Sequence, residues 1–158
     1  MIAYRKRLVI FMLINNITES QKQALDSVMN GRNVFITGGA GTGKTYLLHL
    51  IVEALQKQRK QVVTCSFTNM AALMAKGSTI HRVFGFPVGP CISPKRKQII
   101  TRTNKVLSAT DVVIIDEISM VRIDMMDAIV ASLRKIEQEK QKKIQIVLIG
   151  DFFLASTS

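Results

Sequence analysis

Residues 38–45, which read G-G-A-G-T-G-K-T, constrain the fold of this chain more than any other stretch of its 158 residues. They follow the apolar run 34–36 and precede a helical pattern of leucine and isoleucine that continues to Gln58. A G-x-x-x-x-G-K-T sequence between a strand and a helix is typical of a phosphate-binding loop, because its glycines let backbone N–H groups converge on phosphate oxygens. An ordinary glycine-rich turn is the less favoured alternative, because the strand and the helix stand where the loop requires them.

The end of this loop indicates which side chains a nucleotide would meet. Lys44 is predicted to reach the β- and γ-phosphates of ATP, and the hydroxyl of Thr45 is predicted to bind Mg²⁺. The backbone expected to cradle the phosphates belongs to Gly38, Gly39, Ala40, Gly41, Thr42 and Gly43. The sequence therefore predicts ATP and Mg²⁺ as ligands.

Acidic residues follow two further apolar runs. Asp116 and Glu117 come directly after residues 112–115, so Asp116 is predicted to hold Mg²⁺ and Glu117 to orient and deprotonate the attacking water. A strand followed by a solvated acidic turn is the alternative. Because a second carboxylate follows the metal-binding one, hydrolysis is favoured over phosphoryl transfer to a metabolite. Gly150 and Asp151 end the predicted strand 144–149 in a similar way, and Asp151 is predicted to sense the γ-phosphate, with a plain strand-to-turn glycine as the alternative.

Apolar runs of strand length alternate with segments of helical periodicity throughout the chain. Strands are predicted over 34–36, 61–67, 112–115 and 144–149, and helices over 18–30, 44–58, 70–76, 99–107 and 123–136, with a loop over 85–97. This alternation predicts an α/β fold, a parallel-sheet P-loop NTPase built as a three-layer sandwich, whose ligands bind beyond the carboxyl ends of the strands. Residues 17–158 are expected to form this one domain, and residues 1–16 a leader or an extra strand.

The chain is strongly basic, with 22 Lys and Arg against 11 Asp and Glu and a formal net charge of +11. Residues 54–110 contain no acidic residue, whereas they hold Lys57, Arg59, Lys60, Lys76, Arg82, Lys95, Arg96, Lys97, Arg102 and Lys105. A polyanionic partner is expected, either nucleic acid or an anionic membrane surface, and the acid-free run favours a track for a phosphate backbone over scattered solvated faces. Phe84 and Phe86 lie in this run, where core packing is favoured over base stacking.

No segment is expected to enter a membrane, because the longest uninterrupted apolar run, residues 8–14, is too short to span a bilayer. Basic residues before this run give only a faint resemblance to a signal peptide, without a cleavage site. Cys65 and Cys91 have no C-x-x-C companion, so neither a metal site nor a disulfide framework is expected. A reduced intracellular compartment follows, the cytoplasm or, in a eukaryote, the nucleus or mitochondrion.

Several segments, in this order and spacing, resemble the PIF-type DNA helicases of superfamily 1B, the RecD-like branch. Residues 17–21 look like the adenine-reading Q motif, residues 33–45 like motif I, and residues 67–72 with 77–81 like the DNA-contacting motif Ia region. D-E-I-S-M at 116–120 and G-D-F-F at 150–153 match motif II and the start of motif III. The resemblance implies a RecA-like fold for the domain.

The resemblance also implies an ATP-driven motor that moves on single-stranded DNA and unwinds duplexes with 5′-to-3′ polarity, in replication, repair, recombination or telomere maintenance. By the same resemblance Gln21 reads adenine, Thr68 and His81 lie near the DNA, and Asp151 couples nucleotide state to DNA. Together with the basic loop, the residues expected to contact DNA are Thr68, Asn69, Thr79, His81, Lys95, Arg96 and Lys97.

The sequence departs from the family at two places. Asn69 stands where motif Ia usually has glycine, and residues 154–158 end the chain where the family continues with a glutamine and a Leu-Pro-Pro stretch. A second RecA-like domain with its arginine fingers is thus an expected missing partner, and the chain resembles an incomplete helicase domain 1A with turnover near background. Two interpretations stay open: the ATP-binding motor domain of a DNA helicase, and a truncated or decayed fragment that binds nucleotide, with or without DNA, but does not turn over. Another kind of P-loop ATPase is disfavoured by residues 116–120.

Overall fold

A five-stranded parallel sheet runs through residues 17–87 and 105–151, the part of the chain that the computed structural model describes. Its strands are β1 (Val34–Thr37), β2 (Val62–Ser66), β3 (Ser78–Thr79), β4 (Val112–Asp116) and β5 (Gln145–Gly150). They lie in the order β1-β5-β4-β2-β3, and every neighbouring pair is parallel. The carboxyl ends of all five strands therefore lie at one edge of the sheet.

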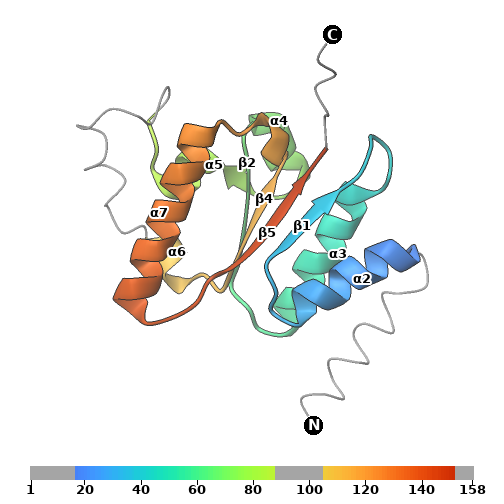
Figure 1. Cartoon of the computed structure of the whole chain (residues 1–158), viewed down its shortest axis with the longest axis horizontal. Helices are drawn as coiled ribbons and strands as arrows, with labels where there is room; N and C mark the ends of the chain where they lie inside the picture. Colours follow the sequence, from blue (N-terminus) through green and yellow to red (C-terminus); the bar gives the residue numbers. More distant parts are fainter. Residues whose placement is uncertain (1–16, 88–104, 152–158) are drawn as a thin grey trace.

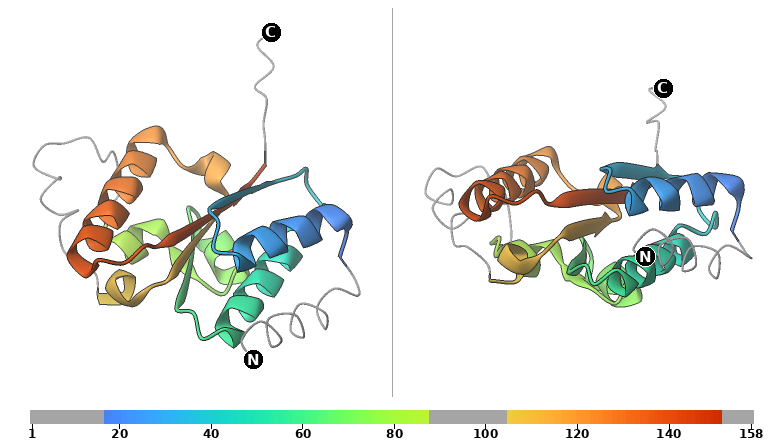
Figure 2. Two further views of the ribbon diagram at one scale, coloured as in Figure 1. Left: turned by 60° about the horizontal axis from the view of Figure 1, so that its bottom comes forward. Right: turned by 90° about the horizontal axis from the view of Figure 1, so that it is seen from below.

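Helices cover both faces of this sheet (Figures 1 and 2). The helices α2 (Glu19–Met29) and α3 (Lys44–Lys57) lie on one side, and α5 (Ile80–Phe84), α6 (Lys105–Ala109) and α7 (Ile123–Lys140) lie on the other. The short helix α4 (Asn69–Met74) and the 3₁₀ turn η2 (Ile118–Met120) follow the carboxyl ends of β2 and β4. The predicted three-layer α/β sandwich is confirmed.

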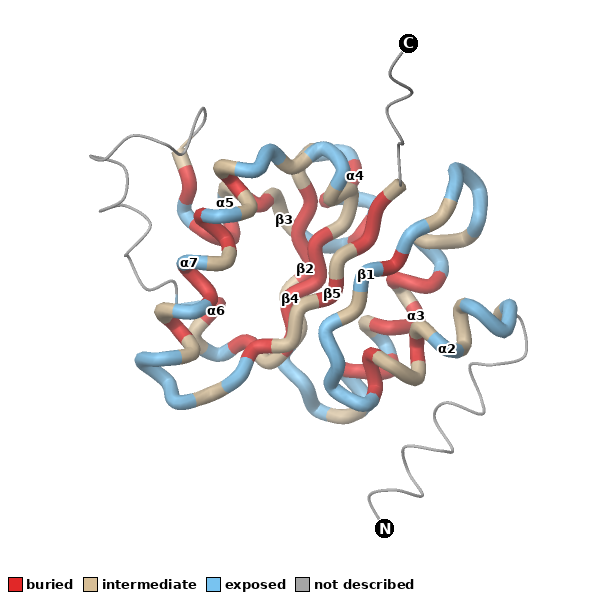
Figure 3. Tube along the Cα trace, viewed as in Figure 1, coloured by how far each residue is buried: buried red, intermediate tan, exposed pale blue. Residues whose placement is uncertain are grey.

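Strand β4 shows how the two cores form from alternating residues. Ile114 packs with the α2 and α3 layer, whereas Val113 and Ile115 pack with α5, α6 and α7. All three side chains are fully buried, because a central strand between two helical layers has no solvent face (Figure 3). This burial on both faces explains why the strand appears in the sequence as one continuous apolar run.

Threonine caps begin three of the helices. Thr18 and Gln21 form a reciprocal capping box at the start of α2, as the sequence predicted for Thr18. Thr68 and Thr79 cap α4 and α5, each accepting a hydrogen bond from a backbone N–H three residues later. The caps at Thr68 and Thr79 lie where the chain leaves β2 and β3 at the carboxyl edge of the sheet.

The segment after β2 contains two elements that the sequence did not predict, β3 and α5. With two residues and no apolar alternation, β3 leaves no periodic signal, and α5 has only five residues. Residues 1–16, the loop residues Lys95, Arg96 and Lys97, and the first part of the predicted 99–107 helix lie outside the described residues. In the described ranges, no helix combines the length and the apolar character needed to cross a membrane.

We expect Gly77→Ala to destabilise the protein by about 1–3 kcal/mol, the usual cost of an overpacked site. A Cβ at Gly77 would lie 2.2 Å from the backbone oxygen of Thr64, so β2 and the α4–β3 turn would have to separate. Gly39→Ala is the control for loss of a glycine, since a Cβ there meets nothing within 4 Å. Urea unfolding of both variants checks this, and equal midpoints would contradict the close approach.

Candidate functional site

The candidate site lies where β1, β5 and β4 end side by side. Thr37 is the register partner of Gly150, so the loop that follows β1 and the residue that follows β5 begin at the same level. Residues 38–43 form the loop, which leads directly into α3 (Figure 1). The parallel arrangement thus brings the predicted phosphate loop and two of the predicted carboxylates to one place.

The loop has the conformation that its glycines allow. Gly41 and Gly43 have φ values of 75° and 83°, in the left-handed region that disfavours other residues. A Cβ on Gly38 would lie 2.7 Å from the Thr42 hydroxyl, which donates a 2.8 Å hydrogen bond to Gly39 O. No side chain caps the start of α3, so its first N–H groups are available to an anion.

Lys44 is the cation of the site. Its Nζ donates to Gly38 O at 2.8 Å and to Gly39 O at 2.7 Å, and it forms an ion pair with Asp151 Oδ1 at 2.5 Å. The Lys44 side chain is only 17% exposed, so this ion pair is shielded from water better than a surface pair is. A phosphate group in the loop would compete with Asp151 for the Lys44 ammonium.

Asp116 ends β4 at the same edge, half-buried. Burial raises the pKa of Asp116 above its usual value; the hydrogen bond from Glu117 N, 2.8 Å long, and the Lys44 charge act against this, while the charges of Glu117 and Asp151 add to it. A charged carboxylate oxygen close to the Lys44 charge suits Mg²⁺, and Thr45, which follows Lys44 in the first turn of α3, carries a hydroxyl oxygen of the kind that Mg²⁺ also accepts. The donor set therefore fits Mg²⁺ with a nucleotide phosphate.

Glu117 points to a different neighbour. Its Oε2 accepts a hydrogen bond of 3.2 Å from the Thr68 hydroxyl, and the Ser66 hydroxyl lies 3.5 Å away. Both residues belong to the end of β2 and the start of α4. The sequence did not single out Ser66, although it stands two positions before Thr68 at the end of an apolar run.

Gln21 connects α2 with the loop. Its Oε1 accepts from Thr18 N at 3.0 Å, and its Nε2 donates to Thr42 O at 3.1 Å. A hollow of about 600 Å³ opens beside it and reaches the loop, lined by Thr18, Ser20, Gln21, Ala24, Phe35, Ile36, Thr37, Gly38, Thr42, Lys44 and Leu47. Sequence reasoning missed the role of Gln21 in holding the loop, because a contact between residues 21 positions apart leaves no local pattern.

The predicted DNA residues lie along the next part of the edge. Asn69 is exposed at the start of α4, Thr79 caps α5, and the His81 ring lies 6.0 Å from the Phe67 ring. Phe84 and Phe86 are 4% and 5% exposed and stack on each other, so their predicted place in the core is confirmed. Lys95, Arg96 and Lys97, from the segment predicted as a loop, are not among the described residues.

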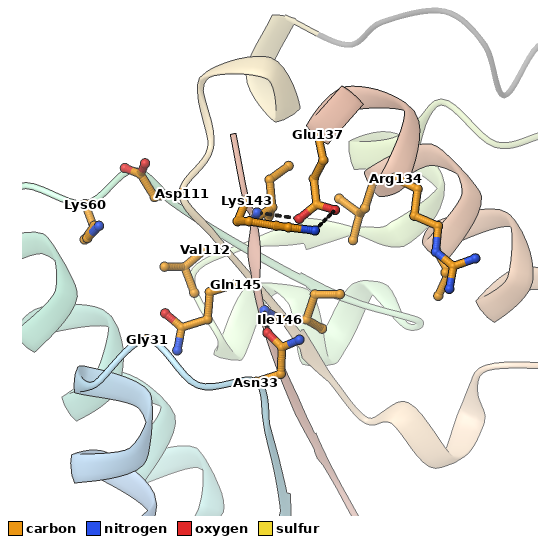
Figure 4. Close-up of a pocket in the computed structure, with 13 residues that line it drawn as sticks. Gly31, Asn33, Lys60, Asp111, Val112, Arg134, Glu137, Lys143, Gln145 and Ile146 are labelled. Atoms are coloured by element: carbon orange, nitrogen blue, oxygen red, sulfur yellow. Dashed lines mark hydrogen bonds and ion pairs between the residues drawn. The ribbon is translucent and has the colours of Figure 1, made fainter. Parts of the chain in front are cut away.

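A second hollow, of about 620 Å³, lies at the opposite edge of the sheet and contains none of the predicted site residues (Figure 4). Several of its polar groups make structural contacts: Glu137 accepts from Ile144 N at 2.8 Å and pairs with Lys143 at 3.7 Å. Asp111 accepts from Gln61 N and pairs with Lys142. This hollow is lined by residues of α7 and of the starts of β4 and β5, away from the predicted phosphate loop.

A parallel sheet with a phosphate loop after β1 and carboxylates at the ends of β4 and β5 defines the class: an α/β nucleotide-binding protein of the P-loop kind. Comparison with known proteins then gives the family. The sequence model described as PIF1-like helicase matches residues 16–155, and the chain belongs to the PIF1-like helicase family. The resemblance seen in the sequence is confirmed.

The chain is similar to curated and solved members of this family. It is 36% identical over 138 residues to the ATP-dependent DNA helicase Pif1 of a Psychrobacter species, covering 84% of this chain and 21% of that protein. With the zebrafish (Danio rerio) helicase PIF1 it shares 32% identity over 155 residues, 94% of this chain and 24% of that one. The chain thus spans about a quarter of these relatives or less.

Solved Bacteroides Pif1 structures share the fold. The one bound to single-stranded DNA has 35% identity and a TM-score of 0.68, covering 86% of this chain and 32% of that one. A complex with ADP-AlF4 has 34% identity and a TM-score of 0.69, covering 85% of this chain and 32% of that one.

We expect Asp116→Asn to raise the stability of the nucleotide-free protein and Asp111→Asn to lower it. Asparagine can still accept the hydrogen bond from Glu117 N, while the buried charge disappears. Burial acts to raise the pKa of Asp111 as well, but the hydrogen bonds from Gln61 N and Lys142, with the Lys142 and Lys60 charges, hold it below its usual value. Asp111, just before β4, and Asp116, at its end, therefore have opposite effects on the stability of the folded protein.

The pH dependence gives the sign of each effect. Because the folded-state pKa of Asp116 is raised, its charge costs stability at neutral pH, and this cost disappears as pH falls through that pKa. Because the folded-state pKa of Asp111 is lowered, its charge stabilises the folded protein above the unfolded-state pKa of about 3.9. This stabilisation is lost as pH falls through the folded-state pKa. Thermal unfolding of both variants at neutral and acidic pH checks this; shifts of the same sign at pH 7 would contradict it.

Proposed function

We propose that this chain is the ATP-binding part of the motor of a DNA helicase that moves on single-stranded DNA with 5′-to-3′ polarity. One observation carries the proposal: Lys44, Asp116 and Asp151 converge at the ends of β1, β4 and β5, next to a loop with the phosphate-binding sequence. Membership of the PIF1-like family supports the helicase part. Because DNA is the substrate, we infer an intracellular location.

Each side chain has a role in this proposal. Lys44 and the backbone of residues 38–43 bind the triphosphate, and Asp151 gives up its ion pair with Lys44 when the γ-phosphate arrives. Thr45 and Asp116 hold Mg²⁺, which supplies positive charge to the phosphate oxygens. Glu117 orients and deprotonates the attacking water.

Gln21 is proposed to face the base of the nucleotide. Its amide has two N–H donors, of which one is used by Thr42 O, so a second donor remains for the base. The hollow beside it adjoins the loop, as the base of a nucleotide held by the loop requires. Exposed Phe35, at 48%, lines the same hollow and offers an aromatic surface.

Single-stranded DNA is proposed to follow the carboxyl edge over α4, β3 and α5. The exposed cations Lys76 and Arg82 lie on this segment, which belongs to the acid-free run 54–110. The predicted contacts of Thr68, Asn69, Thr79 and His81 fall on the same stretch. Lys95, Arg96 and Lys97 are proposed to extend the track from the loop that follows.

We expect Lys44→Ala to weaken Mg·ATP binding at least tenfold, about 1.4 kcal/mol or more, because the ammonium is the main counter-charge for the phosphates. Lys57→Ala is the matched control: it removes a lysine from the other end of α3, where Lys57 forms an exposed pair with Glu53. Isothermal titration calorimetry measures both. Wild-type affinity in Lys44→Ala, or equal losses in both variants, would rule out the assigned site.

We expect this chain to bind an oligo-dT strand weakly, with affinity that falls steeply between about 50 and 200 mM salt, because phosphate contacts release counterions. Reversing the charges of Lys95, Arg96 and Lys97 to glutamate should weaken binding further. Reversing Arg134, Lys140 and Lys143, three exposed cations towards the opposite edge, changes the net charge equally and is the control. Fluorescence anisotropy decides: salt-independent affinity, or equal effects of both triple variants, would contradict the track.

A further inference from the structure

The carboxylate of Glu117 is held on the side of β4 that faces away from the phosphate loop. In the sheet order β1-β5-β4-β2-β3, the strands that carry the loop and Asp151 lie on one side of β4 and β2 lies on the other. The Oε2 atom of Glu117 accepts its hydrogen bond from Thr68, just past the end of β2. The proposed base thus lies turned away from the proposed nucleotide.

The backbone of Glu117 adopts a conformation that is uncommon for residues other than glycine. Its φ and ψ are 53° and 43°, in the left-handed region, while its N–H donates to Asp116 Oδ1. A non-glycine residue persists in this region only where its surroundings hold it there, and such residues cluster at functional sites. The contacts of its side chain with Thr68 and Ser66 are part of what holds it.

The Thr68 hydroxyl can donate one hydrogen bond, and it donates that bond to Glu117 Oε2. The same hydroxyl oxygen caps α4 by accepting from Ala71 N at 3.2 Å. A hydroxyl has one O–H donor, so a hydrogen bond from Thr68 to any other acceptor would replace the one to Glu117. A phosphate oxygen of a nucleic-acid backbone is such an acceptor.

Helix α4, which Thr68 caps, is lightly anchored. Its buried residues are Ala71 and Ala72, whose small side chains fix a helix less firmly than leucine or isoleucine would. On its outer side Met70 and Leu73 are 70% and 74% exposed. A ligand that binds at this helix can therefore shift its start without breaking a large core.

We propose that Thr68 is a positioning residue for Glu117, because its hydroxyl holds the Glu117 carboxylate towards β2. When a backbone phosphate of bound single-stranded DNA accepts the hydrogen bond from Thr68 instead, the Glu117 carboxylate is released towards the nucleotide. The release step rests on the proposed function, from which it takes its ligand. Thr79 provides the comparison, because it caps α5 in the same way, accepting from Arg82 N at 3.3 Å. A cap alone does not distinguish the two threonines, whereas the bond to Glu117 does.

A double-mutant cycle measured by urea unfolding tests whether the Thr68 hydroxyl holds the Glu117 carboxylate, which we call the hold. Thr68→Val and Glu117→Ala are expected to be coupled by at least about fivefold in the unfolding equilibrium constant, because the bond involves a charged acceptor. Thr68→Ser keeps the hydroxyl and should keep the coupling to Glu117→Ala. The Thr79→Val and Glu117→Ala cycle removes an equivalent cap and should show no coupling. Equal coupling in the two valine cycles would overturn the hold.

The threonine methyl signals of ¹³C-labelled protein test the release in the wild-type chain, with two variants as references. The Thr68 signal is identified by its loss in Thr68→Ser, and its position with the bond broken is given by Glu117→Ala. Adding oligo-dT should move the wild-type signal towards that position. An unmoved signal with the oligonucleotide bound, as shown by anisotropy, would overturn the release. No binding at all would overturn the proposed DNA function and the release together, and the cycle would still decide the hold.

Discussion

The ammonium group of Lys44 joins three parts of the chain, and the rest of the site depends on this junction. It bonds the carbonyls of Gly38 and Gly39 just after β1 and the carboxylate of Asp151 just after β5, while its own backbone opens α3. This is possible because β1 and β5 are neighbouring parallel strands that end in register. In an antiparallel pair, the residues that follow the two strands would lie at opposite edges of the sheet.

The same register continues across the sheet and gives the site a second half. Ser66 is the register partner of Asp116, so the segments after β2 and β4 also leave the sheet at one level. Gly150 allows η2 to pack closely there, since a Cβ on it would lie 2.8 Å from the Ile118 side chain. Glu117, between β4 and η2, therefore contacts the start of α4, and the proposed ATP site and the proposed DNA track share a hydrogen bond.

The sequence predicted the architecture well where burial is strongest. Residues 112–115 appear as an unbroken apolar run because a central parallel strand is covered by helices on both faces. Residues 144–149 are apolar except for Gln145, and they too form a strand in the structure. The prediction failed at Ser78 and Thr79, which form β3 by backbone pairing with Cys65 and Ser66. Two polar residues at the sheet edge have no apolar pattern, so only the neighbouring strand identifies them.

By itself, the sequence determined the phosphate loop, the acidic residues at strand ends and the alternation of strands and helices. These features depend on residue type and on spacing along the chain, which are local properties. Only the tertiary structure decided that Lys44 pairs with Asp151, that Gln21 donates to Thr42 O, and that Glu117 bonds to Thr68. Such contacts join residues far apart in the chain, and they follow from the order and register of the strands, which long-range packing sets.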